Sequence, residues 1–227
     1  MKYVKASVLA VFFASGAVKC ISSLIGSMEL NLVSTVLLIP SLTAYYLLTA
    51  ERPDGFILIA LALSAVGDMF MLDTRSADSL MLGIGSFLLS LVFFTAALVR
   101  PVSRFKTLPQ RYYFFLLPYI AFGIAVFLAL RPHLGALLIP CSIYLAVILL
   151  RSFAALCRRG ECRGEWYWFL LIGSILFIAS DSIVAFNVFQ FKNEMRYGAF
   201  LAAITYIPAQ FLLVMGFRGK SGRRRPA

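Results

Sequence analysis

Long apolar segments alternate with short polar breaks along the whole chain. A helix that crosses a membrane needs roughly 20 consecutive apolar residues, and each segment approaches that length. The strands of a membrane barrel would be roughly 10 residues long with strict alternation, which these segments do not show. The pattern therefore predicts an all-α, polytopic membrane protein with eight transmembrane helices over about 4–25, 31–49, 55–72, 79–99, 112–130, 134–153, 166–189 and 198–217.

The breaks between the segments carry charged residues together with Gly, Pro or Ser, which are typical of turns. Examples are Gly26-Ser27-Met28-Glu29, Glu51-Arg52-Pro53-Asp54 and Arg131-Pro132-His133. We expect residues 1–217 to form a single transmembrane domain and residues 218–227 to form a basic cytoplasmic tail.

The composition excludes most other classes of protein. Hydrophobic residues make up 61% of the chain and charged residues 14%, whereas a soluble domain is about 45–50% apolar and about 25% charged. These values exclude a soluble cytosolic domain, a disordered chain and a disulfide-stapled secreted scaffold. The four cysteines and one histidine have no spacing typical of a zinc site, so we expect neither a metal nor a cofactor.

The net charge of +11 would suggest nucleic-acid binding in a soluble protein. Here the basic residues lie between apolar segments, so we interpret them as topology signals and contacts with lipid headgroups, and we expect no nucleic-acid partner. With the N-terminus inside, 16 basic residues lie on the cytoplasmic side and 4 on the opposite side. This bias predicts a protein of the bacterial inner membrane with both termini cytoplasmic. The cytoplasmic residues are Lys2, Lys5, Arg52, Arg100, Arg104, Lys106, Arg111, Arg151, Arg158, Arg159, Arg163, Arg218, Lys220, Arg223, Arg224 and Arg225, and the others are Arg75, Arg131, Lys192 and Arg196.

The first apolar segment has an alternative interpretation. Lys2 and Lys5 followed by an apolar stretch that ends in small residues also fit a cleaved signal peptide. Because the apolar run continues past Lys19 to Ile25, we favour a retained helix.

Three ionisable side chains lie inside the predicted helices, where such groups are costly and usually functional. They are Lys19, Asp68 and Asp181. Counted from the cytoplasmic start of each helix, all three lie roughly 20–23 Å from the cytoplasmic edge at 1.5 Å per residue. The alternative is that Lys19 pairs with one aspartate and the cluster only fixes helix packing. Two carboxyl groups at one depth favour instead an acid/base pair, with one group protonated and the other ionised.

Neutral polar residues lie on the same helix faces. Ser64 precedes Asp68 by four residues, and Tyr206 precedes Gln210 by the same spacing. Each serine taken singly has a simpler interpretation, since small residues let membrane helices pack closely. We expect a polar cavity between the predicted second, third, fourth, seventh and eighth helices. The residues expected to support the two aspartates or bind substrate there are Lys19, Ser64, Ser90, Ser180, Tyr206 and Gln210.

Four motifs occur in an order that is specific to one family. They are Ser-Ala-Val-Gly-Asp-Met-Phe (64–70), the segment 84–90, Gly-Ser-Ile-Leu-Phe-Ile-Ala-Ser-Asp (173–181) and Thr-Tyr-Ile-Pro-Ala-Gln (205–210). This set resembles the lysoplasmalogenase (YhhN-like) family of eight-helix membrane proteins, from about Pro40 to the end of the last predicted helix. The resemblance implies hydrolysis of the vinyl-ether bond of a lysolipid substrate, which releases a fatty aldehyde and glycerophosphoethanolamine or glycerophosphocholine. It also implies that Asp68 and Asp181 are the catalytic residues and that no cofactor is needed.

The sequence departs from the family pattern at three positions. The family's usual His in the fourth helix is Leu91, its Tyr three residues later is Phe94, and the Lys-Pro of the second helix is Ile39-Pro40. Lys19 is a candidate for supplying the missing cation from the neighbouring helix.

Two other classes of function stay open on the sequence alone. One is a proton-coupled transporter of lipids or small solutes, with the aspartates as a relay. The other is a family member that binds a lysolipid without reaction. Because the three charges share one level and the cytoplasmic half is apolar, the hydrolase is favoured. Besides the lysolipid, membrane lipids are the expected partners, and no pattern indicates an oligomeric state.

Overall fold

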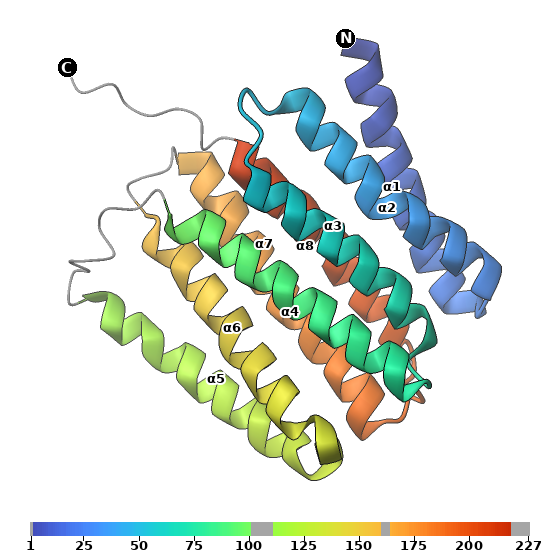
Figure 1. The fold of residues 1–227 in the computed structure, drawn as a ribbon, viewed down its shortest axis with the longest axis vertical. Helices are drawn as coiled ribbons and strands as arrows, with labels where there is room; N and C mark the ends of the chain where they lie inside the picture. The colour runs from blue at the N-terminus through green and yellow to red at the C-terminus, as the bar shows by residue number, and fades with distance from the viewer. Residues whose placement is uncertain (1, 101–110, 160–163, 219–227) are drawn as a thin grey trace.

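The computed structural model describes residues 2–100, 111–159 and 164–218. All regular elements in these ranges are helical (Figure 1). The α-helices are α1 (Lys2–Ile25), α2 (Met28–Thr49), α3 (Gly55–Phe70), α4 (Ala77–Val99), α5 (Arg111–Leu134), α6 (Leu138–Cys157), α7 (Gly164–Ala185) and α8 (Gly198–Arg218), and the short elements are η1 (Met71–Asp73), η3 (Gly135–Leu137) and the π-helical η4 (Phe186–Gln190).

The chain is a multi-pass membrane protein by the length and composition of its helices. Seven continuous helical stretches in the described ranges are long and apolar enough to cross a membrane. One of them, the 46-residue stretch Tyr112–Cys157, contains both α5 and α6, which fold back at η3 and pack side by side (Figure 1). The count of eight spans and their direction across the membrane stay predictions. The loop residues Arg104, Lys106 and Arg163, and the basic tail beyond Arg218, lie outside the described residues.

Consecutive helices form hairpins: α1 packs on α2, α3 on α4 and α7 on α8. Helix α8 also packs against α1 and α2, and α6 packs against α4 and α7, so that α5 and α1 lie at opposite edges (Figure 1). The start of α1 and the end of α8 lie at the same end of the bundle, which we call the terminal end. The turns at residues 26–27, 71–76, 135–137 and 191–197 lie at the other end, called the distal end.

The turn between α5 and α6 lies later in the chain than the sequence predicts. The helix continues through Pro132 to Leu134, and Gly135, with φ +49°, starts the turn. A glycine in the left-handed conformation is a common helix terminator, whereas a proline near the end of a helix removes few hydrogen bonds. Helix α6 therefore runs from Leu138 to Cys157, and Arg151, which was counted only among the charges of the cytoplasmic side, lies six residues before its end with a fully buried side chain.

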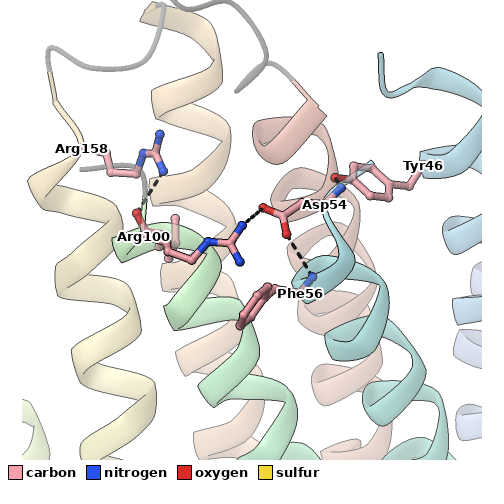
Figure 2. A network of polar contacts seen from close by, with 6 residues as sticks. Tyr46, Asp54, Phe56, Arg100 and Arg158 are labelled. Carbon is pink, nitrogen blue, oxygen red and sulfur yellow. Dashed lines mark hydrogen bonds and ion pairs between the residues drawn. The ribbon is translucent and has the colours of Figure 1, made fainter. Parts of the chain in front are cut away.

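Polar contacts join four helices at the terminal end (Figure 2). Asp54 caps α3 by accepting a hydrogen bond from the Phe56 backbone N–H at 3.0 Å, and its own backbone N–H donates to the Tyr46 hydroxyl at 3.1 Å. Arg100 forms an ion pair with Asp54 at 3.8 Å and lies over the Phe56 ring. Arg158 donates to the Leu98 carbonyl at 3.1 Å. These contacts connect α2, α3 and α4 with the chain that leaves α6.

Helices α7 and α8 approach very closely at two glycines. A Cβ atom on Gly173 would lie 3.0 Å from the Leu213 backbone nitrogen and 3.1 Å from the Ala209 carbonyl oxygen. A Cβ on Gly216 would lie 2.5 Å from Cγ of Leu170. Small residues permit this approach of membrane helices. The contact sets the distance between α7, which carries Asp181, and α8, which carries Tyr206.

We expect Gly173→Ala to destabilise the protein, because the added methyl group meets backbone atoms that cannot move without separating the helices. Overpacking of this kind costs about 1–3 kcal/mol, which lowers Tm by several degrees in a chain of this size. Gly85→Ala is the matched control, since a Cβ there meets nothing within 4 Å and alanine is the better helix former. Equal Tm values for the two variants in detergent would contradict the close contact.

The predicted orientation places Arg159 and Asn193, both exposed, on opposite sides of the membrane. In a variant without native cysteines, a cysteine at Asn193 should react with an impermeant thiol reagent added to intact cells. A cysteine at Arg159 should react only after permeabilisation. Labelling of both positions from outside would overturn the predicted orientation.

Candidate active site

Asp68 lies near the distal end of α3 and is 8% exposed. Its Oδ2 accepts a hydrogen bond from the Tyr206 hydroxyl at 2.9 Å. That hydroxyl accepts in turn from Nε2 of Gln210 at 3.0 Å. Because Tyr206 and Gln210 are four residues apart on α8, one face of this helix supplies the whole chain of donors.

Asp181 has a similar partner from a different helix. Its Oδ2 accepts a hydrogen bond from the hydroxyl of Tyr144 on α6. Each aspartate is therefore held by a tyrosine, and the two tyrosines come from opposite sides of α7. The two carboxyl groups also interact electrostatically with each other.

One cavity of about 460 Å³ brings these groups together. Asp68, Asp181, Tyr144 and Tyr206 all line it, and its lining extends to loop residues of the distal end, such as Arg75. The remaining wall is mainly apolar and comes from α4, α5, α6 and α7; it includes Ile84, Phe87, Phe127, Leu145, Ile148 and Ile178. The cavity was expected between α2, α3, α4, α7 and α8; in the structure α1, α5 and α6 line it as well.

Lys19 lines the same cavity but does not form an ion pair with either aspartate in the described part of the chain. Its ammonium group donates to Oγ1 of Thr35 at 2.6 Å and to Oδ1 of Asn31 at 3.4 Å. It interacts with Asp68 electrostatically only. The alternative in which Lys19 pairs directly with an aspartate therefore does not match the geometry.

The predicted serines serve helix packing. The hydroxyls of Ser64 and Ser90 lie 2.8 Å apart, and Ser90 donates to the Ala60 carbonyl at 2.8 Å, which joins α3 to α4 away from the cavity. Ser180 lines the cavity, yet its hydroxyl donates to the Ala202 carbonyl of α8 at 3.1 Å. Gln210 acts through Tyr206 and does not line the cavity.

The three positions that depart from the family pattern lie in the apolar core. Ile39, Leu91 and Phe94 are all buried and belong to the main hydrophobic cluster. None of them lines the cavity in the described structure.

Two site residues were missed by the sequence analysis. Tyr144 was not considered, and Arg151 was counted as a charge of the cytoplasmic side and not among the charges inside the helices; both lie on α6. Their spacing of seven residues places them on one helix face, and this pattern is visible in the sequence. The side chain of Arg151 is fully buried and interacts electrostatically with Asp181.

Comparison with known families gives one clear match. The model of the YhhN family matches residues 30–217, which include both aspartates, both tyrosines and Arg151 but not Lys19. The match confirms the resemblance drawn from the four sequence motifs. No curated protein and no solved structure matches the chain.

Proposed function

The chain belongs to the YhhN family, and from this membership and the cavity we propose that it is an integral-membrane hydrolase that cleaves the vinyl-ether bond of lysoplasmalogens. The observation that carries the proposal is the pair of aspartates. Asp68 and Asp181 come from separate helices, line one cavity and are each held by a tyrosine hydroxyl.

A vinyl ether is cleaved by adding a proton to its β-carbon. This step forms an oxocarbenium ion at the α-carbon, which water attacks while losing a proton, so that a hemiacetal results. The hemiacetal breaks to a fatty aldehyde and a glycerol hydroxyl group, and one water is consumed. One carboxylic acid can donate the first proton and one carboxylate can face the cation and accept the proton of water, as in glycosidases.

The cavity fits a single-chain lipid. Its volume of about 460 Å³ lies within the usual range of ligand pockets, roughly 300–1,000 Å³. The apolar wall suits an alkyl chain, and the polar groups of Lys19 and Asn31 suit an anionic headgroup. Lys19 keeps one N–H donor beyond its two hydrogen bonds, which is available to a phosphate.

A transporter fits the cavity less well. A transported solute needs a path to both membrane faces, and the described cavity lining stays in the distal half. Towards the terminal end, residues such as Phe94, Leu98 and Phe217 are buried in the hydrophobic core. This arrangement supports a site that is reached from one side only.

Asp68→Asn and Asp181→Asn should each remove aldehyde release from a lysoplasmalogen while the protein still folds. An acid or base group contributes roughly 10²–10⁴-fold to the rate. Asp78→Asn is the matched control, because this aspartate is exposed at the start of α4 and should leave activity unchanged. Activity above about a tenth of the wild-type value in either site variant would exclude the acid/base assignment.

The chemistry also predicts which lipids react. A saturated ether lysolipid cannot form the oxocarbenium ion by protonation at carbon, so it should bind and inhibit competitively without releasing product. A two-chain plasmalogen should react slowly, because its acyl chain needs space beyond the cavity. Aldehyde release and inhibition, measured with the three lipids in detergent, check this order. Equal turnover of one-chain and two-chain vinyl ethers would contradict it.

A further inference from the structure

Arg151 is the most unusual charged residue in the bundle. Its side chain is fully buried, and Nε, Nη1 and Nη2 have no hydrogen-bond partner in the described structure. The guanidinium lies 4.2 Å from the ring centroid of Phe177 and 5.9 Å from that of Phe94. A buried cation is strongly unfavourable unless an anion compensates it, and more so within a membrane.

Asp181 is the anion available to Arg151. Arg151 lies over Phe177, one helical turn before Asp181 on α7, and Tyr144, two turns before Arg151 on α6, binds Oδ2 of Asp181. No hydrogen bond to Oδ1 of Asp181 is present in the described part of the chain. One face of α6 thus carries the tyrosine that binds Asp181 and, two turns later, a guanidinium that lies one helical turn from Asp181 along α7.

The environment of Lys19 differs from that of Arg151. Two neutral acceptors from α2 already bind the Lys19 ammonium. A guanidinium also stays charged in proteins under all ordinary conditions, so Arg151 requires an anion permanently. Asp68 receives hydrogen bonds from the neutral Tyr206–Gln210 chain instead.

We propose that Arg151 is the positioning residue of Asp181: with no ion pair within 4 Å joining them in the described structure, its buried charge compensates that of the Asp181 carboxylate and orients it for catalysis, a relation we call the pairing. Asp181 is then the carboxylate that faces the oxocarbenium ion and the attacking water, and Asp68 is the proton donor. Arg151 does not line the cavity, so it acts through Asp181 without touching the lipid. The division of catalytic roles depends on the proposed hydrolase function, whereas the pairing does not.

A thermal-stability cycle tests the pairing without any activity. Arg151→Met and Asp181→Asn should each lower Tm in detergent, because each leaves one buried group without its partner. The Tm loss of the double variant should be smaller than the sum of the two single losses, since losses at coupled sites are not additive. The matched control combines Arg151→Met with Asp68→Asn and should be additive. The pairing would be overturned if the Tm losses of Arg151→Met and Asp181→Asn were additive. It would also be overturned if Arg151→Met were non-additive with Asp68→Asn and additive with Asp181→Asn.

Kinetics test the positioning role. Arg151→Met should lower kcat roughly 10–100-fold, the effect of losing one interaction with a charged group, while KM stays unchanged. Arg151→Lys should recover part of kcat because it keeps the charge. Ser152→Ala is the control, since this buried serine faces Tyr119 of α5 and should not alter kcat.

The outcomes of the two experiments are separable. A raised KM with unchanged kcat, or a lysine variant no better than methionine, would overturn the positioning role. If Arg151→Met does not fold, Arg151→Gln, which removes the charge but keeps a polar side chain, replaces it in the cycle with Asp181→Asn. If the wild-type protein releases no aldehyde, the hydrolase proposal fails while the stability cycle still decides the pairing.

Discussion

The need to compensate charges inside an apolar bundle governs the distal half of this protein. Asp68, Asp181, Lys19 and Arg151 all lie on helices whose other residues are mostly hydrophobic. In hydrocarbon no bulk water solvates such groups, so each must find donors or acceptors on neighbouring helices. Helices α2, α6 and α8 supply the hydrogen-bond partners of Lys19, Asp181 and Asp68, whereas the Arg151 guanidinium lies against the rings of Phe94 and Phe177.

Close packing of α7 on α8 complements these polar contacts. At Gly173 and Gly216 the two helices touch almost backbone to backbone. This places Tyr206 of α8 beside Asp68 of α3 and leaves Asp181 on the other face of the cavity, within reach of α6. The terminal half has the opposite character, because its core is built from aromatic and aliphatic residues such as Phe94, Phe177 and Phe217.

Helix α1 lies outside the part of the chain that matches the YhhN family, yet it contributes Lys19 to the cavity. The Lys19 ammonium binds Thr35, which lies one helical turn before Ile39, where the family pattern has a lysine. Lys19 thus stays a candidate for supplying from α1 the cation that the family pattern has on α2. Ile39, Leu91 and Phe94, the three departures from the family pattern, are buried in the core and do not line the cavity in the described structure.

The sequence by itself predicted the helical membrane fold, because apolar segments of membrane-spanning length separated by turn residues are a local property of the chain. It also predicted Asp68 and Asp181 as the central pair, since carboxyl groups within apolar helices are rare and costly. It misplaced Arg151, because a charge that follows an apolar run also marks the usual end of a helix at the membrane surface. Only the tertiary structure decided that Tyr144 binds Asp181, that Arg151 is buried over Phe177, and that Ser64 and Ser90 bind each other away from the cavity. These outcomes depend on how α4, α6 and α7 rotate against one another, and that rotation is set by packing between residues far apart in the sequence.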